Sequence, residues 1–87
     1  MRTYHKIRGI LATADLTYEE FAKLCGVTRQ TIHTYLSGKV YMEDMENGVK
    51  CMAMADKIMA LCQSGALPIS LEIPKEPRVA TIRLLLG

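Results

Sequence analysis

The segment from residue 28 to residue 37 carries the side chains with the most evident chemistry. Its polar residues are Arg29, Gln30, Thr31, His33, Thr34 and Ser37. They can donate and accept hydrogen bonds, and only the arginine carries a permanent charge. An arginine such as Arg29 pairs best with guanine O6 and N7, and a glutamine such as Gln30 with adenine N6 and N7, each good pair discriminating by about 1–3 kcal/mol. The pattern therefore suits contact with the edges of base pairs.

The remaining reactive residue types give little support for catalysis or for a metal site. Cys25, Cys51 and Cys62 are widely spaced among apolar residues, which favours reduced, buried thiols over a disulfide framework. Neither histidine stands at zinc-finger spacing from a cysteine. No nucleophile with an orienting carboxylate, phosphate loop or pair of carboxylates stands out. We expect no enzyme activity, no metal, no cofactor and no small-molecule ligand.

Two helices separated by a short glycine turn must position the polar segment. Thr17 and Glu20 match a capping box that starts a helix over residues 18–25. Gly26 ends that helix, because glycine adopts the left-handed conformation without a Cβ clash. Thr28 then caps a second helix that ends near residues 37–38. So short a turn predicts helices that cross at about 90–120°.

Further helices are predicted on both sides of this pair. Residues 3–14 carry apolar residues at helical spacing. Another helix begins around Glu43 or Asp44 and reaches residues 64–65, with Met45, Met52 and Met59 repeating every seven residues. That helix is apolar on more than one face. We therefore expect one face to pack on its own domain and another face to be covered by a further element or partner.

The pattern of apolar and polar residues changes in the C-terminal part of the sequence and favours strands. Apolar and polar residues alternate through Ile69, Leu71 and Ile73, and an apolar stretch over residues 79–86 follows two prolines. This pattern predicts a short β-hairpin or strand pair. The expected fold is mainly α, with a four-helix domain over residues 1–65 and a strand-rich segment over residues 66–87. An isolated strand pair is marginal in water, so we expect dimerisation through Met52, Met59, Ile69, Leu71, Ile73, Ile82 and Leu84.

Length, composition and charge are consistent with one small domain, and the sequence predicts no membrane-spanning segment. The chain has 87 residues, 49% of them hydrophobic, and a net charge of +2. Residues 1–39 hold six lysine or arginine residues against three acidic ones, which makes them the candidate phosphate-facing part. Asp56 and Lys57 interrupt the apolar run from Met52 to Cys62, and no signal-peptide core is evident. We expect a cytoplasmic protein.

Residues 16–39, LTYEEFAKLCGVTRQTIHTYLSGK, resemble the helix-turn-helix of Cro- and repressor-type phage and bacterial regulators. The matching positions are Ala22 in the first motif helix, Gly26 and Val27 at the turn, and Ile32 and Tyr35 in the second helix. The strand-like tail departs from the all-helical repressors, although Cro-like proteins that dimerise through a C-terminal strand offer a parallel.

The resemblance implies a role for each matching polar residue. It implies base contacts in the major groove from Arg29, Gln30, Thr34 and His33. It implies contacts to the DNA backbone from Tyr18, Thr28, Thr31, Ser37 and Lys39. The same polar residues are also typical of a solvated helix face, and Lys6 and Arg8 read as ordinary solubilising charges.

Two functions follow as hypotheses. The first is a homodimeric, sequence-specific DNA-binding transcriptional regulator, a repressor that binds a palindromic operator with two recognition helices about 34–36 Å apart. The alternative is a protein-interaction module, such as an antitoxin or host-factor inhibitor. In that case the helix-turn-helix is a scaffold, and the tail docks a partner by strand addition.

Overall fold

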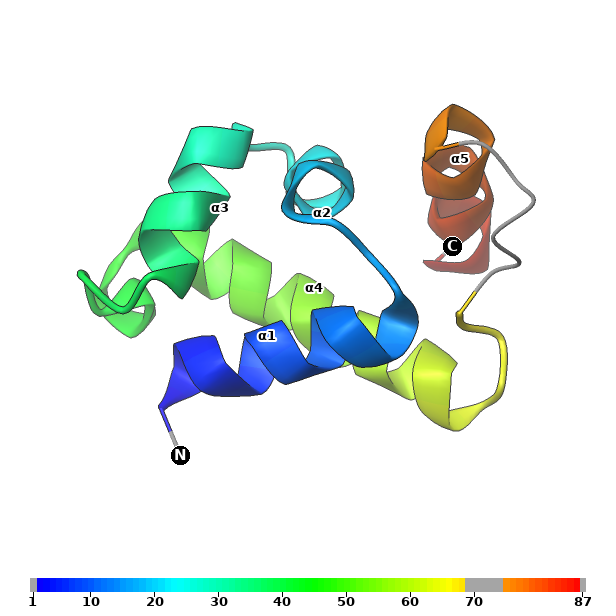
Figure 1. Cartoon of the computed structure of the whole chain (residues 1–87), viewed down its shortest axis with the longest axis horizontal. Helices are drawn as coiled ribbons and strands as arrows, with labels where there is room; N and C mark the ends of the chain where they lie inside the picture. The colour runs from blue at the N-terminus through cyan, green and yellow to red at the C-terminus, as the bar shows by residue number, and fades with distance from the viewer. Residues whose placement is uncertain (1, 69–74, 87) are drawn as a thin grey trace.

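The computed structural model describes residues 2–68 and 75–86 and shows five α-helices and one short 3-10 helix there (Figure 1). The elements in chain order are α1 (Thr3–Ala14), α2 (Tyr18–Cys25), α3 (Arg29–Leu36), η1 (Met42–Asp44), α4 (Glu46–Gln63) and α5 (Lys75–Leu86). Helix α1 packs on α4, and α2 packs on α3. Helix α5 lies beside α2, at the other end of the molecule from α3 (Figure 1).

The helix starts and stops predicted around the glycine turn are confirmed. The Thr17 hydroxyl accepts a hydrogen bond from the Glu20 backbone N–H at 3.1 Å, and the Glu20 carboxylate accepts one from the Thr17 N–H at 3.0 Å. Gly26 ends α2 with a left-handed φ of 76°. The Thr28 hydroxyl accepts from the Thr31 N–H and caps α3. Local capping chemistry therefore sets both ends of the turn.

Helix α4 begins slightly later than the sequence predicts, because residues 42–44 form the 3-10 turn η1 first. Met42 is buried, and its carbonyl oxygen lies directly against Gly48 in the first turns of α4. Only a glycine leaves room for this approach, since a Cβ at position 48 would overlap that oxygen. This contact fixes the angle at which the chain enters α4.

The core is shared by all five α-helices of the described residues. Its side chains with the least exposed surface include Ile7, Phe21, Ile32, Ile58 and Ile82. Cys25 and Cys51 are free thiols buried in the same core. A hydrogen bond with the Cys51 thiol, together with burial, raises the pKa of the Cys25 thiol well above its ordinary value. These cysteines therefore behave as small core residues, as the sequence indicated.

The prediction of a C-terminal β-hairpin or strand pair is wrong. Residues 75–86, which include the second expected strand, form helix α5, and the described residues contain no strand. The first expected strand, with Ile69, Leu71 and Ile73, lies outside the described residues. Pro77 falls in the first turn of α5, where a backbone N–H has no intrahelical acceptor, so it does not interrupt the helix. The apolar residues after Pro77 do not alternate, and a helix buries Val79 and Ile82 together on one face.

Hydrogen bonds as well as apolar contacts attach α5 to the rest of the domain. The Arg78 guanidinium donates to the Asp15 carbonyl oxygen at 2.6 Å, and its Nε lies 3.7 Å from the Glu20 carboxylate. The Arg83 guanidinium donates to the Lys23 carbonyl oxygen at 2.9 Å. Val79 and Ile82 belong to the same core cluster as the buried residues between Ile7 and Leu67. Helix α5 is thus packed on the preceding helices.

Candidate nucleic-acid interface

Helix α3 is divided into a buried apolar face and an exposed polar face. Ile32, Tyr35 and Leu36 are buried. The residues expected to contact bases point outward: Arg29, Gln30 and His33 are exposed, and Thr34 is half-buried. The sequence prediction of a polar face opposite the core is therefore confirmed, while its contact with DNA stays a prediction.

The first turn of α3 is held in place by two threonines. Thr28 caps the helix, and its hydroxyl oxygen lies 2.9 Å from the hydroxyl oxygen of Thr31. The neighbouring Arg29 and Gln30 side chains are exposed on the same turn. Their backbone N–H groups stand at a helix start, where intrahelical acceptors are missing. The turn thus presents two long polar side chains from a fixed backbone.

Tyr18 connects the start of α2 to α3. Its ring centroid lies 6.3 Å from that of His33. A hollow of about 460 Å³ lies on one side of it, lined by Thr17, Tyr18, Glu19 and Arg29. A smaller hollow of about 150 Å³ is lined by Arg8, Tyr18, His33, Leu36 and Ser37. Three helices therefore contribute to one surface around Tyr18.

Arg8 is the member of this surface that the sequence interpretation missed. The sequence predicts an ordinary solubilising charge at this position of α1, whereas the structure places Arg8 at the hollow with His33 and Ser37. Arg8 reaches this hollow because α1 packs beside the end of α3. A local sequence motif does not predict that packing. The basic residue extends the polar surface from α3 onto α1.

The end of α3 is fixed by Ser37 and Gly38. The Ser37 hydroxyl donates to the Thr34 carbonyl oxygen at 2.7 Å and accepts from the Lys39 N–H at 3.4 Å. Gly38 adopts a left-handed φ of 81°. Lys39, expected to contact the DNA backbone, is exposed directly after this turn. Ser37 therefore holds the loop that carries Lys39.

The residues expected at a dimer interface lie in different environments. Met52 and Met59 are half-buried and pack against the core. Ile82 has no exposed surface, so its side chain fills the core of its own chain. Leu84 is 83% exposed and Leu85 is 44% exposed. Of the expected residues that the structure describes, Leu84 offers the largest free apolar surface.

Across residues 2–68 and 75–86, no cluster of three or more histidine, cysteine, aspartate or glutamate residues is arranged to hold a metal ion. No helix within these ranges combines the length and the apolar character needed to cross a membrane.

Comparison with known proteins adds no relative. Neither a family model, nor a curated protein, nor a solved structure matches this chain.

Proposed function

We propose that this protein is a sequence-specific DNA-binding transcriptional regulator that acts in the cytoplasm as a homodimeric repressor. One observation carries the proposal. Arg29 and Gln30 project from the capped first turn of α3, and Arg29 lines a hollow with Tyr18 at the capped start of α2. A helix start of this kind, with long donors on a fixed backbone, suits direct readout in the major groove.

In the proposed complex, α3 lies in the major groove and α2 crosses the DNA backbone. Arg29, Gln30 and Thr34 contact base edges, with His33 beside them. Tyr18, Thr28, Thr31, Ser37 and Lys39 contact phosphates, and Arg8 joins them because it shares the hollow with Tyr18. Phosphate contacts of this kind orient a protein on the duplex, and base contacts give it sequence preference.

The dimeric part of the proposal rests on α5. Leu84 and Leu85 expose apolar surface at the C-terminal end of this helix, and contact with a second copy would cover it. A two-fold dimer presents two α3 helices to successive major grooves, about 34–36 Å apart, and therefore selects a palindrome.

Selection of bound fragments from random duplexes at about 0.15 M salt tests the proposal. We expect an enriched palindromic motif. The Arg29→Ala protein should lose preference at one base pair of each half-site, at a cost of about 1–3 kcal/mol there. Lys57→Ala, which removes an exposed positive charge from α4, is the matched control and should keep the motif. Recovery of unrelated sequences that bind only at low salt would refute sequence-specific regulation.

The alternative function is a protein-interaction module, for which the exposed Leu84 and Leu85 also provide a surface. Strand addition by residues 75–86 no longer supports this alternative, because those residues are helical. Replacement of Arg29, Gln30 and Thr34 together by alanine distinguishes the two functions. The triple variant should lose DNA binding under the first function and should keep partner binding under the second.

A further inference from the structure

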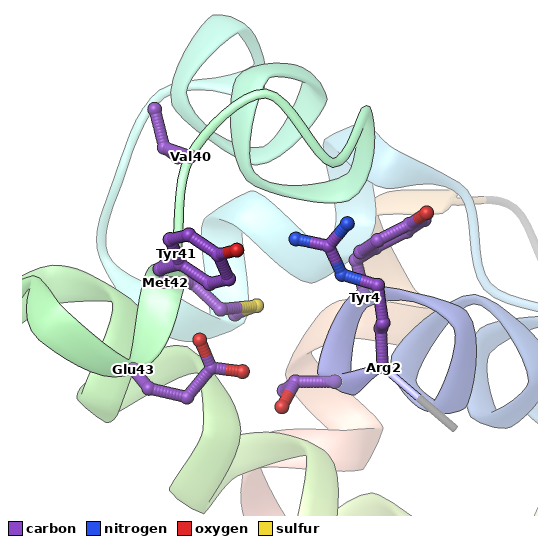
Figure 2. Close-up of a pocket in the computed structure, with 7 residues that line it drawn as sticks. Arg2, Tyr4, Val40, Tyr41, Met42 and Glu43 are labelled. Atoms are coloured by element: carbon purple, nitrogen blue, oxygen red, sulfur yellow. The ribbon is translucent and has the colours of Figure 1, made fainter.

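A second polar cluster lies at the start of α1, where Arg2 is held between two tyrosines (Figure 2). The guanidinium carbon of Arg2 lies 5.3 Å from the centroid of the Tyr4 ring and 5.1 Å from that of the Tyr41 ring. Tyr41 is 65% exposed, so its ring and hydroxyl are accessible to a ligand. The three side chains border a hollow of about 320 Å³ between α1 and the loop before η1.

Among residues 2–68 and 75–86, no acceptor uses the hydrogen-bond donors of the Arg2 guanidinium. Within the described residues, it makes cation–π contacts and no hydrogen bond or ion pair. Contacts with two rings restrict the side chain, so less conformational entropy is lost when it binds. A guanidinium offers paired donors that match the oxygen atoms of a phosphate group.

Glu43 is the acidic residue that lines the same hollow. A hydrogen bond from the Thr3 hydroxyl lowers the pKa of Glu43, and the charge of Arg2 lowers it further. Figure 2 shows the Arg2 guanidinium in the space between the two rings, with the Glu43 carboxylate at another edge of the hollow. The Glu43 carboxylate therefore has the Thr3 hydroxyl as its hydrogen-bond donor, and it interacts with Arg2 through charge alone.

The cluster is continuous with the proposed DNA surface. A Cβ atom at Gly38 would lie 2.8 Å from the Tyr4 ring, so this ring packs directly against the turn between Ser37 and Lys39. Tyr4 and Arg8 are four residues apart and share one face of α1. Arg8 in turn lines the hollow beside α3. Arg2 thus stands at the far end of one surface that begins at the first turn of α3.

We infer that Arg2, held between Tyr4 and Tyr41, binds a backbone phosphate of the DNA that flanks the base pairs read by α3. This inference rests on the proposed DNA-binding function and adds a contact outside the recognised sequence. Tyrosine hydroxyls also donate to phosphate oxygens in protein–DNA complexes, so Tyr41 can support the same contact. Tyr41 and Lys39 both lie in the segment between the end of α3 and the start of η1, so this segment joins the proposed phosphate contact to α3.

Binding to two duplexes of different length tests the inference. Both contain the motif selected by the wild-type protein; one ends at the motif, and the other extends about 5 base pairs beyond it on each side, half a helical turn. Arg2→Ala should weaken binding to the long duplex about fivefold to tenfold. It should also reduce the slope of log K against log salt by about 0.9, the value for one phosphate contact. The same variant should bind the short duplex as the wild type does.

Lys57→Ala, which removes the same charge from an exposed position on α4, is the control and should leave both duplexes unaffected. Equal binding of Arg2→Ala and wild-type protein to the long duplex would overturn the inference. So would an equal loss on both duplexes, because the contact would then not lie in the flank. If the wild-type protein selects no duplex at all, the proposed function fails as well, and this outcome is distinct from the other two.

Discussion

The buried carboxylate of Glu20 has two roles, one for each of its oxygens. One oxygen accepts the Thr17 N–H and completes the cap of α2. The other, Oε2, lies 3.7 Å from Arg78 Nε, and neither Oε2 nor Nε has a hydrogen-bond partner within the part of the chain that the structure describes. Glu20 is 1% exposed and Arg78 is 8% exposed. A buried pair of this kind repays its desolvation only in part, but the removal of one partner leaves an uncompensated charge.

Glu20→Gln separates these two roles. The glutamine oxygen can still accept the Thr17 N–H, since glutamine also completes a capping box. Among the described residues, Asp15 then remains as the acidic partner of Arg78; its carboxylate lies 3.5 Å from the guanidinium and is half exposed. We expect the free energy of unfolding to fall by about 2 kcal/mol. Urea denaturation followed by circular dichroism measures this change.

The double variant Glu20→Gln with Arg78→Met provides the control. Because it removes both charges, its loss of stability should be smaller than the sum of the losses in the two single variants. Additive losses would mean that the Glu20 and Arg78 side chains do not interact, which would contradict the proposed charge pairing.

At the scale of the elements, two glycines in helices have opposite surroundings. A Cβ at Gly48 would overlap the Met42 carbonyl oxygen, whereas a Cβ at Gly9 would have no neighbour within 4 Å. Gly48→Ala should therefore force η1 and α4 apart and destabilise the protein by about 2 kcal/mol or more. Gly9→Ala should stabilise it by about 0.5–1 kcal/mol through helix propensity alone. Thermal denaturation of both variants tests the pair, and equal melting temperatures would show that the η1–α4 contact is not tight.

The elements also show which features a sequence can predict. Helices α2 and α3 were predictable because their signals are local: Thr17, Glu20, Gly26 and Thr28 specify the ends by themselves. Once the start of α3 is known, the helical repeat also predicts which of its residues face outward. Helix α5 was not predictable in this way. A proline near a helix start and a proline at a turn look alike in sequence, and the choice depends on burial of residues 79 and 82 against distant helices.

The parts of the candidate site that come from α1 were unpredictable for a related reason. Arg8 and Arg2 join the surface only because α1 lies beside the end of α3. This placement depends on contacts such as Tyr4 against Gly38, between residues far apart in the chain. A sequence pattern that describes neighbours along one helix does not contain this information.

At the scale of the whole molecule, the C-terminal helix is part of the compact domain. The radius of gyration is 12.2 Å, close to the value of about 12 Å for a compact chain of this length. Helix α5 contacts both α2 and α4. It buries one side in the shared core and leaves Leu84 and Leu85 on the outside. The C-terminal segment can therefore stabilise the monomer and, in the proposed dimer, contact a second copy through different residues.

Ile82 and Leu84 allow these two contributions to be measured separately. Ile82 has no exposed surface, and Ile82→Ala should lower the free energy of unfolding by about 2–4 kcal/mol through the cavity it creates. Leu84 is 83% exposed, so Leu84→Asp should change monomer stability by less than about 0.5 kcal/mol. If α5 forms the dimer interface, the same variant should weaken self-association in sedimentation equilibrium, because a carboxylate would be desolvated at the contact. Lys57→Ala is the control for a surface change away from α5. A Leu84→Asp protein that still dimerises like the wild type would place the dimer interface on another surface, and a stable Ile82→Ala protein would contradict the packing of α5.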